Sequence, residues 1–226
     1  MVVAGADGCP DGWVVCFKGS GGRLSLRVVG ALDEIFDLVI GLTVLAVDMP
    51  IGLLDCPGGR DCEVEARKLL GKKGSSVFAS PCRQALDGKT HEEANRTSKT
   101  LGSGISVQAF GLFPKLIEVD RLLRKRPGLR ALVYEAHPEL AFARLNGGAP
   151  VLSKKRKSDG RADRLRLLAT HGLQPETTKL KGARADDVLD AIACYRTALL
   201  IASGTATRLG HADARDRYDL PMNIWF

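Results

Sequence analysis

Long apolar runs are missing from this sequence of 226 residues. No stretch reaches the roughly 18 consecutive apolar residues that a membrane-spanning helix needs. The first residues also lack the basic, apolar and small-residue order of a secretory signal peptide. We therefore expect a cytoplasmic protein with no membrane partner. Hydrophobic residues make up 45% of the chain and charged residues 26%, which is ordinary for a globular protein, so we expect a single domain over 1–226.

Cysteine pairs at metal-binding spacing are missing as well. The six cysteines are scattered and include no C-x-x-C pair, which argues against a zinc site and against a dithiol redox couple. We expect reduced thiols, with Cys16 and Cys194 filling the core because their neighbours are apolar.

Aromatic residues make up only 5% of the chain, so few side chains are present that could stack on the bases of a single-stranded nucleic acid. Trp13, Trp225 and Phe226 are equally compatible with a place in the core.

Positive charge is in excess, with 33 Lys and Arg against 26 Asp and Glu and a formal net charge of +7. A basic balance favours polyanionic partners. The segment "SKKRKSDGRADRLR" concentrates this charge over 153–166 and predicts phosphate contacts from Lys154, Lys155, Arg161 and Arg164. The alternative is a solvated loop that leads into the wet face of a helix.

The order of predicted elements indicates an α/β fold. Apolar, β-branched runs at 2–7, 13–18 and 24–30 are separated by turn residues and predict three antiparallel strands. A helical pattern over 31–42 then leads into the apolar run "TVLAVDMP", and a strand reached through a helix is expected to be parallel. Later runs predict a strand at "RALVYE", helices over 160–172 and 185–204, and a last strand within "YDLPMNIWF".

Residues 51–127 are too many for a simple crossover and predict a helical insertion in the domain. Within it, helices are expected from Asp61 onward and over "LFPKLIEVDRLLRKR", and "THEEANRTSKTLGSG" is polar and helix-prone. The whole order matches a ribonuclease H-like mixed sheet, with three antiparallel strands followed by parallel ones and helices on both faces.

Carboxylates stand where three of the predicted strands end. Asp7 ends the first strand, Asp48 ends "TVLAVD", and Glu135 ends "ALVYE". The carboxyl ends of strands are where an α/β sheet opens its ligand crevice. In "ADDVLDAIAC", Asp187 and Asp190 share one helix face and can point to the same place.

Grouped carboxylates raise one another's pKa unless a cation neutralises them, and oxygen-only ligands suit Mg²⁺ or Mn²⁺. Two such ions about 4 Å apart can activate a water and stabilise the leaving oxygen of a phosphodiester. Each acid also has a structural alternative. Asp7 and Asp48 can cap a turn, Glu135 can pair with a basic side chain, and Asp186 and Asp187 can cap a helix. His137, in "EAHPE", is a candidate acid, base or supporting group, and Asp186 a second supporting candidate.

Seven motifs taken in order resemble the family of domain of unknown function 429. They are "GADGCPDGWV", "AVDMPIGL", "SSVFASPCR", "QAFGLFPKLIEVD", "EAHPELAFARLNG", "SKKRKSDGRADRL" and "DDVLDAIAC". The resemblance runs along nearly the whole chain and implies a predicted nuclease with a ribonuclease H-like fold. It assigns no chemistry to Lys115, Glu118 and Asp120.

A more distant likeness, to Holliday-junction resolvases of the same fold, implies roles for the acids. Asp7 matches their first-strand acid, and Asp187 and Asp190 resemble their helix pair. The middle acid is either Asp48 or Glu135.

These observations predict a metal-dependent nuclease that acts on DNA or RNA. Asp7, Asp48 and Asp190 are expected to bind Mg²⁺ or Mn²⁺, with Glu135 and Asp187 completing the catalytic group. One alternative is a nucleic-acid-binding or assembly protein without turnover. The other is an actin-like phosphotransferase, although "GKKGSS" lacks the upstream glycine spacing of a phosphate loop.

Overall fold

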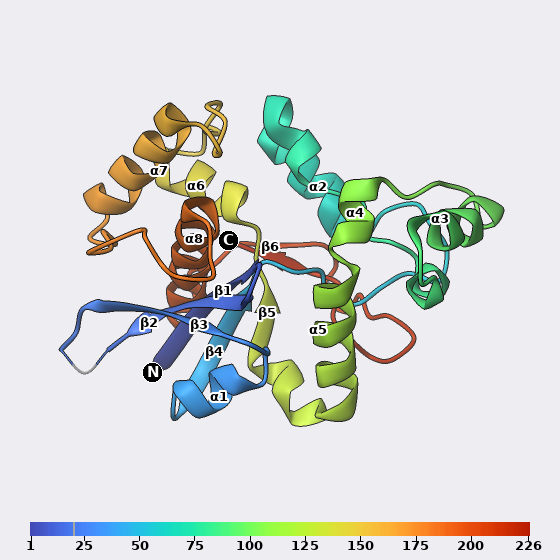
Figure 1. Cartoon of the computed structure of the whole chain (residues 1–226), viewed down its shortest axis with the longest axis horizontal. Helices are drawn as coiled ribbons and strands as arrows, with labels where there is room; N and C mark the ends of the chain where they lie inside the picture. Colours follow the sequence, from blue (N-terminus) through green and yellow to red (C-terminus); the bar gives the residue numbers. More distant parts are fainter. Residues whose placement is uncertain (20) are drawn as a thin grey trace.

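A five-stranded mixed sheet forms the centre of the computed structural model, which describes residues 1–19 and 21–226 (Figure 1). The strands lie in the order β3-β2-β1-β4-β5. Their bounds are Val2–Cys9 for β1, Gly12–Lys18 for β2, Leu24–Val29 for β3, Leu42–Val47 for β4 and Val133–Glu135 for β5. The first three strands pair antiparallel, whereas β4 runs parallel to both β1 and β5. This arrangement is ribonuclease H-like, as the sequence predicts.

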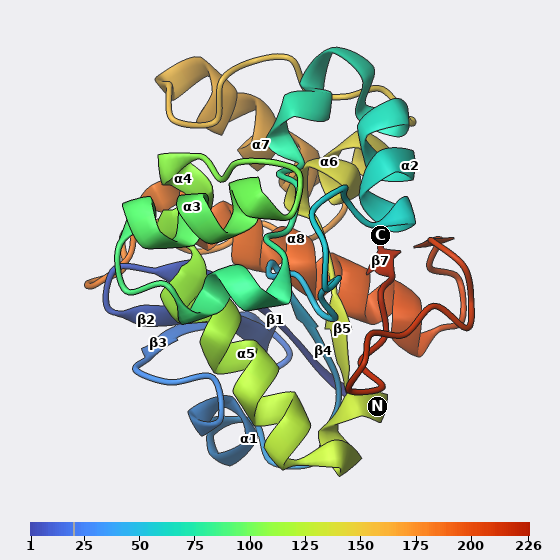
Figure 2. The ribbon, with the colours of Figure 1, turned by 90° about the vertical axis from the view of Figure 1, so that its right-hand side faces the viewer.

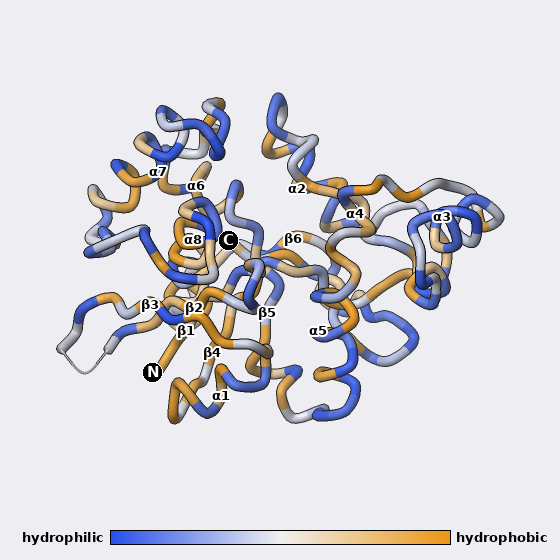
Figure 3. Tube along the Cα trace, in the orientation of Figure 1, coloured by the Kyte–Doolittle hydropathy of each residue, from blue (hydrophilic) through white to orange (hydrophobic). Residues whose placement is uncertain are grey.

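Alternation along the strands builds one core on each face of the sheet. On one face, residues such as Val3, Val14 and Cys16 pack against the helices α6 (Pro138–Leu145), α7 (Ser158–Thr170) and α8 (Ala185–Ala202). On the other face, Ala4 and Val15 pack toward α1 (Glu34–Leu38) and α5 (Phe113–Lys125). Figure 3 shows the hydrophobic residues gathered along the central strands.

Helix α8 lies directly on β1 because Gly5 has no side chain. A Cβ built on Gly5 would stand 1.9 Å from the backbone nitrogen of Tyr195 and 2.5 Å from the carbonyl oxygen of Ala191. The missing side chain therefore lets the two backbones approach, and it fixes the height of α8 above the sheet.

The chain between β4 and β5 carries several helices. They are α2 (Asp61–Leu70), the 3₁₀ turns η1 (Gly71–Ser76) and η2 (Arg83–Asp87), α3 (His91–Thr100), α4 (Val107–Gly111), α5 and the 3₁₀ turn η3 (Pro127–Ala131). The helices predicted from Asp61 and over 112–126 are confirmed as α2 and α5, and the polar segment after Lys89 forms α3. Figure 2 shows α2, α6 and α7 at the end of the sheet away from the N-terminus.

The late strand within "YDLPMNIWF" is shorter than predicted. Only β7 (Ile224–Trp225) forms, and it pairs with the equally short β6 (Arg208–Leu209). Trp225 also bridges to Ala136 beyond β5, and its ring meets that of Tyr134 edge-on at 5.7 Å between centroids. The aromatic and β-branched composition is therefore explained by packing over the end of β5.

Two further predictions concern cysteines and membranes. Cys16 and Cys194 are buried in the core as free thiols, as expected. Within the described part of the chain, no helix combines the length and the apolar character that crossing a bilayer requires.

Candidate metal centre

Three carboxylates from distant parts of the chain meet at the carboxyl end of the central strands. One oxygen from each of Asp7, Asp48 and Asp190 lies within 4.8 Å of the other two. Asp7 belongs to β1, Asp48 directly follows β4, and Asp190 belongs to α8. This is the only such group of potential ligands among residues 1–19 and 21–226.

Strand pairing explains why the first two acids meet. β1 and β4 run parallel with Ala6 opposite Val47, and the Asp48 amide donates to the Ala6 carbonyl at 3.0 Å. The two strands therefore deliver their next side chains to the same point. The close approach of α8 to β1 at Gly5 adds Asp190 from above.

Burial and mutual repulsion dominate the electrostatics of this group. Asp7 and Asp190 are buried, and Asp48 is partly buried. Burial, together with the charges of Asp48 and Asp190, raises the pKa of Asp7 well above its usual range. Burial also raises the pKa of Asp48 and of Asp190 to about 6 each. Three carboxylates held this close are therefore costly to ionise without a cation.

One positive side chain partly offsets that repulsion. The Lys155 ammonium donates to Asp190 Oδ2, and its charge lowers the pKa of all three carboxyl groups. Burial disfavours the charged form of Lys155, but the attraction of Asp190 and Asp48 outweighs it and raises the Lys155 pKa. Lys155 was predicted to contact phosphates, whereas here it contacts the acids.

The donor set fits a hard divalent cation. All three groups offer oxygen, which suits Mg²⁺ or Mn²⁺ better than zinc. The Asp190 Oδ1 atom is buried and accepts no hydrogen bond from any described residue, so it has a free coordination position. The nearby Cys194 thiol has a pKa raised by burial and by the three acids, so it stays protonated and does not compete as a ligand.

Glu135 lies outside this group, which is a correction to its predicted catalytic role. Its carboxylate accepts hydrogen bonds from Arg60 Nη1 and Nη2 at 2.7 Å each and from the Ile51 amide at 2.7 Å. All of these groups are buried, so the arginine neutralises the acid in place. Of the two candidates for the middle acid, Asp48 therefore lies beside Asp7 and Asp190, and Glu135 does not.

Asp187 and Asp186 lie at the start of α8 beside the group. Asp187 Oδ2 accepts from the Arg184 amide at 2.9 Å, which is the helix-capping alternative, although its charge still raises the pKa of Asp7. Asp186 faces Arg156, with 3.7 Å between the charged atoms. Neither residue contributes an oxygen to the three-acid group.

His137 stands at the N-terminus of α6, near the site. Its Nε2 atom is 3.4 Å from the Ser76 carbonyl oxygen, and burial lowers its pKa, so the neutral ring is favoured. His137 does not belong to the three-acid group, and its role as a supporting group stays a prediction.

Arg164, which was predicted to contact phosphates, is a second correction to the predicted site. It is fully buried, and its Nη2 atom donates to both oxygens of Glu139 at 2.6 and 2.8 Å, so it cannot reach a phosphate. Of the other predicted phosphate contacts, Lys154 is exposed and Arg161 donates to the Arg156 carbonyl at 2.7 Å.

Glu139 lies close enough to raise the pKa of Asp48 and Asp190, and no feature of the sequence indicates this influence.

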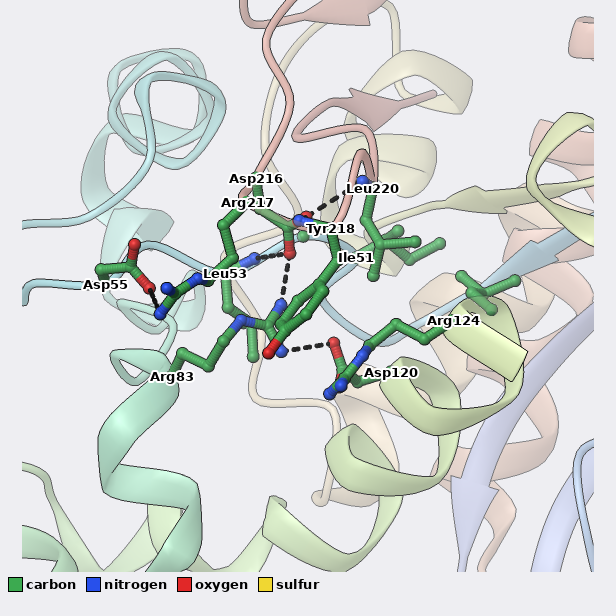
Figure 4. Close-up of polar contacts among 12 residues, drawn as sticks. Ile51, Leu53, Asp55, Arg83, Asp120, Arg124, Asp216, Arg217, Tyr218 and Leu220 are labelled. Carbon is green, nitrogen blue, oxygen red and sulfur yellow. Dashed lines mark hydrogen bonds and ion pairs between the residues drawn. The ribbon is translucent and has the colours of Figure 1, made fainter. Parts of the chain in front are cut away.

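The unassigned residues of "PKLIEVD" hold the fold together. Glu118 accepts from Trp13 Nε1 at 3.1 Å and from the Leu32 amide at 2.5 Å, and Lys115 lies 4.8 Å from the centroid of the buried Trp13 ring. Asp120 pairs with Arg83 at 2.8 Å, as Figure 4 shows. "GKKGSS" forms the turn η1 rather than a loop between a strand and a helix, which is unlike a phosphate loop.

Comparison with known proteins gives one match. A family model described as protein of unknown function (DUF429) matches residues 5–215, a range that includes the three acids and Lys155. No curated protein and no solved structure matches the chain.

Proposed function

This chain belongs to the DUF429 family, whose function is not assigned, and we propose from its site that it is a metal-dependent nuclease. The reaction is hydrolysis of phosphodiester bonds in DNA or RNA with Mg²⁺ or Mn²⁺. The observation that carries the proposal is the meeting of Asp7, Asp48 and Asp190 within 4.8 Å on a ribonuclease H-like sheet.

The three acids share one task in this mechanism and perform it from different elements. Asp7 and Asp48 hold divalent ions from the rigid ends of adjacent parallel strands, and Asp190 holds them from α8. When bound, the ions supply an activated water and stabilise the leaving oxygen. The surrounding packing fixes the carboxylates before any substrate binds, because Asp190 sits on a helix clamped against β1 at Gly5.

Positive charge near the site supports a polyanionic substrate. Lys154, Arg156 and Lys157 are exposed on the segment that carries Lys155 over the acids. Neutralising phosphates releases counterions, so substrate binding should weaken steeply with added salt.

The test is cleavage by the purified full chain with Mn²⁺ or Mg²⁺ on single-stranded, duplex, hybrid and branched nucleic acids. Asp7→Asn and Asp190→Asn should each lower cleavage by about 100-fold or more, because each removes a metal ligand. Asp37→Asn makes the same chemical change at an exposed position of α1 and should leave cleavage unchanged. Absence of cleavage on every substrate, or full activity in both site variants, contradicts the proposal.

A binding protein without turnover gives the opposite pattern in the same set of proteins. Its affinity for nucleic acid depends on salt but not on EDTA or on Asp190. A filter-binding titration with and without EDTA therefore separates the two functions.

A further inference from the structure

The segment 152–157 carries Lys155 into the acid group and is anchored behind it. The Ser153 carbonyl accepts from Arg164 Nη1 at 3.2 Å and from Lys73 Nζ at 3.3 Å. A Cβ on Gly160 would lie 2.1 Å from the Lys154 carbonyl oxygen, so the segment also packs directly on the first turn of α7. The backbone at Lys155 is therefore fixed.

The Lys155 side chain, in contrast, can move away from the acids into solvent. It is 37% exposed, whereas its partner Asp190 is 2% exposed. A lysine has a flexible four-carbon stem, so its ammonium can swing to solvent while the backbone stays in place. Asp190 has no such freedom, because it belongs to the helix packed on β1.

The ammonium also interacts with the carboxylates that would hold a metal. It hydrogen-bonds to one oxygen of Asp190, and it lies near enough to Asp48 and Asp7 to act on the charge of both. A divalent ion among the same carboxylates would repel it strongly in this poorly hydrated site. The ammonium and a divalent ion would therefore compete for the charge of these carboxylates.

We propose that Lys155 is the counter-ion of the metal-free site and that a divalent ion displaces its ammonium group into solvent. The inference rests on the proposed metal site and assigns Lys155 a second state in which its charge is free to face a substrate. It also implies that Lys155 opposes metal binding, so that metal affinity in this protein is lower than the three carboxylates alone would give.

Amine labelling tests the displacement directly in the unaltered chain. A limiting amount of an amine-reactive ester is added in EDTA or in excess Mg²⁺, and acylation is read at each lysine by peptide mass spectrometry. Mg²⁺ should speed acylation of Lys155 roughly tenfold, the factor that corresponds to losing one charge-assisted hydrogen bond. The exposed neighbour Lys154 is the internal control and should react at the same rate in both conditions. An unchanged rate at Lys155 overturns the inference.

Metal affinity tests the competition independently of labelling and of cleavage. At pH 8, Mn²⁺ binding is measured by calorimetry for the unaltered chain, Lys155→Met and Lys154→Met. Lys155→Met should bind Mn²⁺ roughly tenfold more tightly, because it keeps the apolar stem and loses the competing charge. Lys154→Met should bind as the unaltered chain does. Equal or weaker binding by Lys155→Met contradicts the inference.

The two experiments also separate this inference from the proposed function. Mn²⁺ binding that needs Asp190 but does not mobilise Lys155 contradicts the exchange and leaves the metal site standing. Exchange without cleavage of any nucleic acid supports the counter-ion role and contradicts the nuclease. If neither the unaltered chain nor Lys155→Met binds Mn²⁺, both proposals fail.

Discussion

At the scale of single residues, ionisation of the buried Asp48 carboxyl group is expected to destabilise the folded protein when no metal is bound. Its pKa of about 6 in the folded chain lies above the ordinary aspartate value of 3.8, chiefly because the side chain is buried. Between these two pH values the folded chain binds more protons than the unfolded chain does. The free energy of unfolding should therefore fall as pH rises through this range.

Asp48→Asn should remove the part of this pH dependence that Asp48 contributes, while Asp7 and Asp190 keep theirs. In EDTA at pH 7.5, where the carboxylate is ionised, the variant should be more stable than the unaltered chain by about 1–3 kcal/mol, since one pKa unit corresponds to about 1.4 kcal/mol. At pH 4 the two proteins should unfold alike. Denaturant unfolding at both pH values measures the difference, and Asp37→Asn is the control. Equal stability at pH 7.5 would contradict the cost of ionising the buried Asp48 carboxyl group.

At the scale of elements, the contact of α8 with β1 positions Asp190. Gly5→Ala would place a methyl group 1.9 Å from the Tyr195 nitrogen and must push the helix away from the strand. We expect a loss of about 3 kcal/mol in the free energy of unfolding and weaker Mn²⁺ binding. Gly128→Ala is the control, because no described heavy atom lies within 4 Å of a Cβ at that position. Unchanged Mn²⁺ affinity in Gly5→Ala would show that the helix position does not set the site.

The pairing of α6 with α7 depends on the buried Glu139–Arg164 ion pair. Arg164→Met leaves the Glu139 charge buried and alone, so we expect a loss of about 3–5 kcal/mol in the free energy of unfolding. The double variant Arg164→Met/Glu139→Met removes both charges and should recover most of that loss. Arg166→Met changes a side chain of α7 that is 72% exposed, and it should change stability by less than about 0.5 kcal/mol. Unchanged stability of Arg164→Met would contradict the cost of leaving the buried Glu139 charge without a partner.

The elements that sequence periodicity predicts are the ones with a continuous apolar face. α5 and α8 have such faces. Asp7 lies near the end of β1, which continues to Cys9 beyond the predicted end, and Asp48 directly follows β4. Pairings between distant charged residues leave no periodic signal. Arg60 reaches Glu135 across 75 positions, and Lys155 reaches Asp190 across 35. The meeting of the three acids could therefore be predicted, but the residues that pair with Glu135 and Lys155 could not.

At the scale of the whole molecule, Asp216 ties together three distant segments of the chain (Figure 4). Its carboxylate accepts from the Leu53 amide at 3.1 Å, from Arg83, and from the amides of Tyr218 and Leu220 at 2.8 and 3.0 Å. Arg83 in turn donates to Asp120 on α5. The C-terminal segment is thus fastened to the loop after β4, to η2 and to α5.

Asp216→Ala should therefore detach the C-terminal segment under conditions in which the central sheet is still folded. Because the change leaves the buried Arg83 guanidinium with one partner fewer and removes an acceptor for three amides, we expect a loss of about 3 kcal/mol in denaturant unfolding. Trypsin should cut after Arg215 and Arg217 several times faster than in the unaltered chain. Asp213→Ala, at an exposed position of the same segment, should leave both measurements unchanged.

The three acids lie on β1, on α8 and directly after β4, so Mn²⁺ should still bind to Asp216→Ala at a temperature at which this variant remains folded. Loss of Mn²⁺ binding together with faster cleavage by trypsin would mean that the hydrogen bond between Asp216 and the Leu53 amide also sets the position of Asp48.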